Sequence, residues 1–96
     1  MNLIITTDKI TTKTLIKTNK FVEYFTDSNY EEHISNNLNN IKIIIIKNTS
    51  DFYENISYFI EKYNPAKIFL TGFCSSTNNF YKIGDIVIPS ELSQLI

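Results

Sequence analysis

Short apolar blocks separated by polar loops dominate the first half of the chain and predict an order of strand, helix and strand. Residues 3–6 form an apolar run that indicates a buried strand. We expect a helix after it, capped by Thr7 or Asp8 and continuing through about Lys17. Residues 21–25 alternate between apolar and polar side chains, which is typical of a strand.

A hairpin is predicted in the middle of the chain. Apolar positions in 34–37 and 41–47 flank Leu38, Asn39 and Asn40, and asparagine tolerates the positive φ that tight hairpin turns use. Residues 41–46 are β-branched at all but one position, so this arm is predicted to be a central strand buried on both faces.

The clearest helix is predicted to follow residues 48–51, which offer capping side chains. Apolar residues then recur at spacings of three and four, at Phe52, Ile56, Phe59, Ile60 and Tyr63. The pair Asn64-Pro65 should end this helix. Two more strands are predicted, at 68–71 and at 86–88.

These elements predict an α/β fold with a mixed, largely parallel sheet, one hairpin and flanking helices. The strand, helix and strand of residues 41–70 have the right length for a right-handed parallel crossover. This interpretation requires 41–47 and 68–71 to be parallel neighbours. Because open α/β sheets bind ligands beyond the carboxyl ends of their strands, the loops at 48–51 and 72–79 are the predicted site.

Composition narrows the classes of function. The 96 residues are expected to form one domain, 1–96, and the net charge of −1 offers no field for nucleic acid or a membrane surface. All nine basic residues are lysine, so the side chain best suited to bidentate phosphate binding is missing. One cysteine cannot form an intrachain disulfide, and no apolar run is long enough to span a bilayer, so we expect a cytoplasmic protein.

One segment resembles a known family. Residues 71–85 read TGFCSSTNNFYKIGD and residues 86–89 read IVIP. This is similar to the signature of the nucleoside phosphorylase and methylthioadenosine/S-adenosylhomocysteine nucleosidase family, T-G-x-A-G-G-L, a short loop and K-x-G-D-I-V. The match needs no gap at Thr71, Gly72, Lys82, Gly84, Asp85, Ile86 and Val87. The resemblance covers about residues 31–89 and implies the first half of that fold.

The resemblance implies cleavage of the N-glycosidic bond of a nucleoside, with phosphate or water as the nucleophile and an oxocarbenium-like transition state. By position in the motif, the substrate-binding residues would be Gly72, Phe73, Cys74, Ser75 and Ser76, and the anion-loop residues Thr49 and Ser50. The two serines stand where the family has paired glycines, so their side chains would hinder a close approach of base and sugar. Asp51 adds a negative charge at the anion loop, which disfavours phosphorolysis.

The resemblance also indicates missing catalytic groups. The nucleosidase branch has a glutamate after its first strand, whereas Asp8 is the only carboxylate there. The family's ribose-binding Met-Glu pair and its general acid lie in a second half, beyond Ile96. We therefore expect a truncated or degenerate member of the family that is inactive alone, with no catalytic residue, no cofactor and weak binding of a nucleoside or nucleobase.

Two other functions stay open. The first is a non-catalytic interaction module that self-associates or pairs with a full-length relative, since a half-domain leaves strand edges and apolar surface uncovered. The second is an enzyme completed by another polypeptide. In either case we expect a homo-oligomer or a pair with a related chain.

The remaining chemically capable residues have simple structural interpretations. Cys74 with His33 as a base would be a nucleophile pair, but nothing in the sequence places them together. His33 is expected to be a surface residue of a strand, and Glu31 and Glu32 a solvated turn. No metal site is expected, because no His, Cys and carboxylate residues have ligand spacing along the chain.

Overall fold

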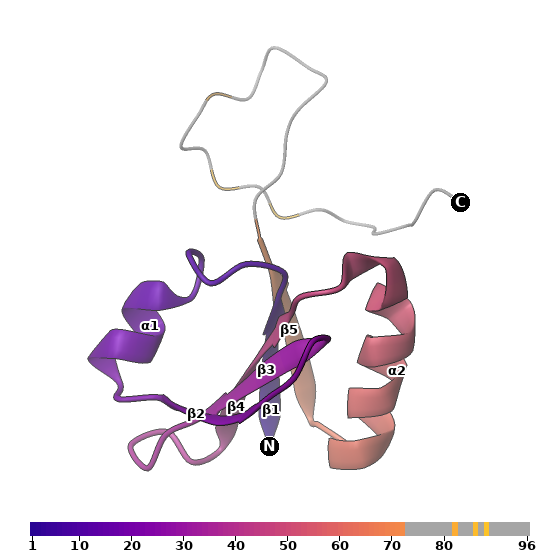
Figure 1. Cartoon of the computed structure of the whole chain (residues 1–96). Helices are drawn as coiled ribbons and strands as arrows, with labels where there is room; N and C mark the ends of the chain where they lie inside the picture. The colour runs from indigo at the N-terminus through magenta and orange to yellow at the C-terminus, as the bar shows by residue number, and fades with distance from the viewer. Residues whose placement is uncertain (73–81, 83–85, 87, 89–96) are drawn as a thin grey trace.

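The chain forms a five-stranded sheet with a helix on each side (Figure 1). The computed structural model describes residues 1–72 with 82, 86 and 88, and the backbone alone at Asp51. The elements are β1 (Asn2–Thr6), α1 (Lys13–Thr18), β2 (Val22–Thr26), β3 (Tyr30–Ile34), β4 (Ile41–Ile46), a 3₁₀ turn η1 (Thr49–Asp51), α2 (Phe52–Tyr63) and β5 (Lys67–Thr71). In space the strands follow the order β2-β3-β4-β1-β5.

The sheet is mixed, and the expectation that it is largely parallel is not confirmed. In the described part of the chain β1 pairs in parallel with β4 and with β5, whereas β2–β3 and β3–β4 are antiparallel. The prediction of one hairpin missed the pairing of β2 with β3. The short loop at 27–29 turns the chain directly from β2 into β3. The Asp27 carboxylate stabilises this turn, because it accepts hydrogen bonds from the backbone N–H groups of Asn29 and Tyr30.

The position of β1 makes the centre of the sheet differ from the expected arrangement. Strands β4 and β5 run in the same direction, as the crossover through α2 predicts, but they are not neighbours. The expectation that 41–47 and 68–71 are adjacent, which the interpretation from sequence required, is therefore wrong. Strand β1 lies between them, with Ile4 opposite Ile43 on one side and Phe69 on the other. A central position suits β1 physically, because Leu3 and Ile5 lose their whole apolar surface there.

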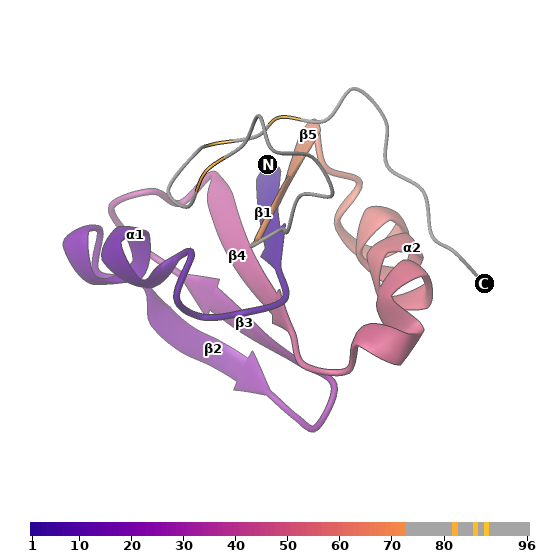
Figure 2. The same cartoon turned by 90° about the horizontal axis from the view of Figure 1, so that it is seen from above.

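Two apolar clusters hold the helices against opposite faces of the sheet (Figure 2). On the α2 face, Phe59 is completely buried against side chains of β1 and β4. On the α1 face, Ile43 and Ile45 pack against Phe21 and residues of α1. Because β4 contributes isoleucines to both clusters, its predicted burial on both faces is confirmed.

The two helices differ in how well the sequence predicted them. Helix α2 spans Phe52–Tyr63 as expected, and Asn64 follows it with a φ of 43°, a left-handed conformation that asparagine adopts readily. Helix α1 begins only at Lys13. The carboxylate of Asp8 accepts hydrogen bonds from the backbone of Ile10 and Thr11, so it closes a turn before the helix instead of capping it.

Two further expectations can be compared with the structure. A turn at Asn39-Asn40 is present, since the backbone N–H of Ile41 donates to the carbonyl of Leu38. The first arm of the hairpin is Tyr30–Ile34 and not 34–37, and neither asparagine has a positive φ, so these two parts of the expectation are wrong. The expected strand at 86–88 is not formed at Ile86 and Ile88, which are exposed and outside any strand, and Val87 lies outside the described residues. Within the described ranges, no helix has the length and apolar character needed to cross a membrane.

Candidate functional site

The carboxyl ends of β1, β4 and β5 lie along one edge of the sheet, because the three strands are parallel. The chain leaves β1 toward α1 on one face and leaves β4 toward α2 on the other face (Figure 2). In open α/β sheets, ligands usually bind at the carboxyl ends of adjacent parallel strands whose connections depart to opposite faces. The loops after Thr6 and Ile46, and Gly72 after Thr71, border this edge, which we call the strand-end edge.

The loop after β1 is held by its own side chains. The hydroxyls of Thr6 and Thr11 lie 2.8 Å apart, and Oδ1 of Asp8 accepts from Ile10 N at 2.8 Å and from Thr11 N at 3.1 Å. One carboxylate oxygen of Asp8 therefore stabilises this loop.

Hydrogen bonds among its own residues also hold the predicted anion loop. Thr49 and Ser50 are exposed at the start of η1, and Asn48 Oδ1 accepts from the backbone N–H of Ser50 at 3.2 Å and from its hydroxyl at 2.6 Å. An anion at this turn would have to replace the Asn48 carboxamide at the Ser50 N–H.

Gly72 is the predicted substrate-binding residue that the structure describes. It follows β5 at the strand-end edge, where a Cβ atom added to it would lie 3.8 Å from Oγ1 of Thr7, an ordinary contact distance. The absence of a side chain is therefore not required by the packing of the described residues. The other predicted positions, Phe73, Cys74, Ser75 and Ser76, lie outside the described residues.

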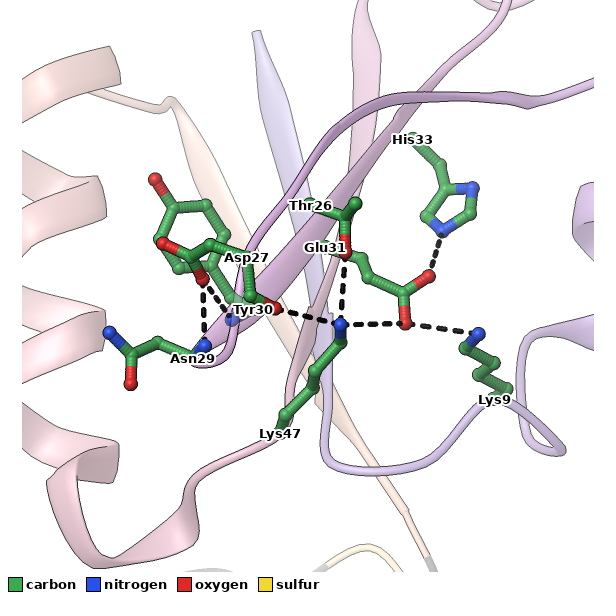
Figure 3. A network of polar contacts seen from close by, with 8 residues as sticks. All are labelled: Lys9, Thr26, Asp27, Asn29, Tyr30, Glu31, His33 and Lys47. Carbon is green, nitrogen blue, oxygen red and sulfur yellow. Dashed lines mark hydrogen bonds and ion pairs between the residues drawn. The ribbon is translucent and has the colours of Figure 1, made fainter.

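A polar network lies beside this edge, on the α1 face, and is centred on Glu31 (Figure 3). Lys9 Nζ, from the loop after β1, is 3.0 Å from Glu31 Oε2, and Lys47 Nζ, just after β4, is 3.8 Å from the same oxygen. His33 Nε2 is 3.2 Å from Oε1. Lys47 also donates to Thr26 Oγ1 at 2.9 Å. The network thus links the two strand ends to β2 and β3.

Glu31 is ionised in this setting. Its burial, at 2% exposure, raises the pKa of the carboxyl. Hydrogen bonds from Lys9 and His33, together with the charges of Lys9 and Lys47, outweigh burial and hold the pKa below its ordinary value. A buried carboxylate with two cations on one oxygen and an imidazole on the other is therefore present next to the strand-end edge.

A second buried carboxylate lies on the α2 face. Glu32 accepts a hydrogen bond from the hydroxyl of Tyr63, and Lys42 Nζ lies 4.0 Å from the centroid of the Tyr63 ring. Burial lowers the pKa of Lys42, although the charge of Glu32 opposes this effect. Burial also raises the pKa of Tyr63, to about 12, with a further contribution from the hydrogen bond to Glu32.

The expectation of a solvated turn at Glu31 and Glu32 is wrong, because both belong to β3 and both are buried. His33 is in a strand as expected, but its side chain is only 12% exposed, so it is not a surface residue. The burial of these side chains could have been predicted from the alternation of side chains along a strand, which has a period of two residues. If residues 30–34 are read as a strand, Glu31 and His33 share one face and Tyr30 and Glu32 the other.

The structure also brings together a group that sequence spacing did not indicate. One donor atom each from Glu23, Glu31 and His33 lie within 4.8 Å of one another, because Glu23 is opposite His33 in the β2–β3 ladder. These three residues come together in the fold although they have no ligand spacing along the chain. The pairing of Cys74 with His33 lies outside the described residues.

A hollow of about 320 Å³ lies at the other end of the strands, where it is lined by Lys20, Val22, Ile34 and residues of the β3–β4 loop. It does not coincide with the strand-end edge. Comparison of the chain with family models, with curated proteins and with solved structures finds no match.

Proposed function

We propose that this chain is a nucleoside-binding domain of the nucleoside phosphorylase and nucleosidase type, and that it does not cleave the glycosidic bond by itself. The observation that carries the proposal is the segment that begins with Thr71 and Gly72 at the end of β5 and continues as K-x-G-D-I-V at 82–87. A cytoplasmic location is part of the proposal and is supported by the single cysteine.

The arrangement of the strands supports a ligand at the start of this segment. Gly72 directly follows β5 and adjoins Thr7, which directly follows β1. The insertion of β1 between β4 and β5 keeps the three carboxyl ends on one edge, so the site would be formed by three strand ends instead of two. The absence of a side chain at Gly72 allows a planar base or a sugar to approach the backbone.

The contacts at the other strand ends support binding without catalysis. Asp8 is occupied in its own loop, and the N–H of Ser50 is capped by Asn48. Protonation of the leaving base and activation of the nucleophile supply much of the rate enhancement in glycosidic cleavage. We assign neither role to a residue of this chain.

The test is nucleoside binding by the purified chain. Adenosine, inosine, methylthioadenosine and adenine are titrated and followed by isothermal calorimetry and by the shift of the melting temperature. We expect at least one of them to raise the melting temperature. Gly72→Ala should weaken binding by about tenfold while it leaves the melting temperature of the free protein unchanged, because its Cβ has room. Ser57→Ala, on an exposed part of α2, is the control.

Two results would count against the proposal. If none of the four compounds binds at millimolar concentration, the nucleoside-binding function is wrong. If the chain alone releases free base from a nucleoside in a chromatographic assay, the statement that it is inactive by itself is wrong.

The alternative function, an interaction module, is favoured by one observation. Strands β2 and β5 are the outer strands of the sheet, and both carry exposed aromatic side chains, Tyr24 at 63% and Phe69 at 53% exposure. Among the described residues no strand pairs with either outer edge. Such edges pair readily with another chain unless something covers them.

A further inference from the structure

We infer that Glu23, Glu31 and His33 form a binding site for a divalent transition-metal ion, with zinc as the best match. The site lies on the β2–β3 hairpin and is independent of the proposed nucleoside function. Zinc accepts nitrogen from histidine and oxygen from carboxylates, and three protein ligands leave a fourth position for water.

The backbone of the hairpin places the three donors on one face. Glu23 and His33 are directly opposite each other in the antiparallel ladder. Glu31 and His33 are two residues apart in β3, so they point to the same side. Pairing in the ladder brings the backbones of these two ligands together, and the register of the ladder shifts directly after this pair, between Glu23 and Phe25.

The distances agree with a tetrahedral ion. His33 Nε2 and Glu31 Oε1 are 3.2 Å apart. Two ligands bound to zinc at 2.0–2.1 Å with tetrahedral angles are separated by about 3.3 Å. All three donors already lie within 4.8 Å of one another. Glu23 is exposed, so its side chain can rotate to close the remaining distance and its side of the site is open to water.

Lys9 and Lys47 both approach Oε2 of Glu31, and the ligating oxygen Oε1 is hydrogen-bonded to His33 Nε2. Carboxylates that bind metals commonly receive a hydrogen bond on the other oxygen, which fixes their orientation. Lys9, at 3.0 Å from Oε2, is placed to do this for Glu31.

The imidazole faces the site through Nε2. Nε2 and Glu31 Oε1 are within hydrogen-bond distance of each other, and in the metal-bound form the ion takes the place of the proton between them. Nδ1 of His33 is buried and has no hydrogen-bond partner among the described residues, and an ion bound at Nε2 leaves that atom unchanged.

Cobalt(II) is the probe, because its four-coordinate complexes absorb visible light, and the protein is used with Cys74→Ser to remove the only thiol. We expect visible absorption bands on titration and their loss when zinc is added. The chain has one histidine, so the C2 proton of His33 gives a single imidazole signal in the NMR spectrum, and cobalt should shift or broaden it.

Variants separate this site from unspecific binding. Glu23→Gln should weaken cobalt binding by about tenfold or more, and it should fold normally because Glu23 is exposed. His33→Ala should abolish the absorption bands. Glu54→Gln, at an exposed acidic position on α2, should bind like the parent. Equal binding by the parent and Glu23→Gln, or an imidazole signal that cobalt leaves unchanged, would overturn the inference.

Discussion

Glu31 and Glu32 are neighbours in the sequence, yet their side chains lie on opposite faces of β3, buried to 2% and 1% exposure. Each carboxylate meets a different donor: Lys9 reaches Glu31 on the α1 face, and the Tyr63 hydroxyl reaches Glu32 on the α2 face. A buried charge that loses its partner is strongly destabilising. Both faces of this small sheet therefore depend on a polar contact as well as on apolar packing.

The contact between Tyr63 and Glu32 can be tested by removing one hydroxyl. Tyr63→Phe keeps the ring against Phe59 but leaves the Glu32 carboxylate without this donor. We expect the free energy of unfolding at neutral pH to fall by about 1–3 kcal/mol, measured by urea denaturation. Tyr53→Phe removes the hydroxyl of a 45% exposed tyrosine on the same helix and should change little. Equal losses in the two variants would contradict the role of this hydrogen bond.

The free energy of unfolding at alkaline pH should depend on the ionisation of the same tyrosine, Tyr63. Its pKa is raised from 10.0 in the unfolded chain to about 12 in the fold. Between these values the folded state holds a proton that the unfolded state has released, so stability declines as the pH rises from 10 toward 12. In Tyr63→Phe this decline should be smaller, and part of it should remain, because the pKa of Tyr30 is also raised by burial. Chemical denaturation at several pH values measures both slopes, and identical slopes would exclude Tyr63 as the source.

The loss of stability at acid pH should depend on the protonation of Glu31. Its pKa in the fold is below the ordinary value of 4.5, so the folded state binds fewer protons than the unfolded state in that range. The stability that Glu31 contributes is therefore complete above about pH 4.5 and is lost as the pH falls through the lower folded value. Glu31→Gln should be less stable than the parent at neutral pH and should depend less on pH below 4.5. Parallel curves for the two proteins would refute this assignment.

The sequence predicted the parts of the fold that local periodicity determines. Helix α2 has apolar residues at spacings of three and four, and its end at Asn64 follows from the proline after it. The isoleucine run of β4 similarly indicated a strand covered on both faces. The direction of β5 followed from the length of the crossover.

The order of the strands could not be predicted in the same way. Whether β1 lies between β4 and β5 or outside them depends on which arrangement buries Leu3 and Ile5, and this is a property of the whole sheet. The network at Glu31 depends on the same arrangement, because Lys9 follows β1 and Lys47 follows β4. Two adjacent glutamates also indicated a solvated segment. Partners that are distant in the sequence, Lys9 for Glu31 and Tyr63 for Glu32, allow both to be buried.

The central position of β4 gives a test of packing. Ile44 is completely buried between β1, β3 and α2, and Ile44→Val should lower the free energy of unfolding by about 0.5–1.5 kcal/mol. Ile10→Val makes the same chemical change at a side chain that is 70% exposed, so it should be close to neutral. Urea denaturation of both variants measures the difference. A neutral Ile44→Val would mean that this side chain is not in the core.

The outer strands give a test of self-association. Phe69 on β5 and Tyr24 on β2 are exposed aromatic residues on opposite edges of the sheet. If a second copy covers β5, Phe69→Thr should weaken the dimer about tenfold or more, and Tyr24→Thr should leave its dissociation constant unchanged. If only Tyr24→Thr weakens the dimer, β2 is the strand that pairs. Threonine keeps a high strand propensity in both variants, so an effect on association is not a consequence of lost strand structure. Sedimentation equilibrium measures the dissociation constants. If the parent chain remains monomeric at millimolar concentration, self-association through either outer strand is excluded.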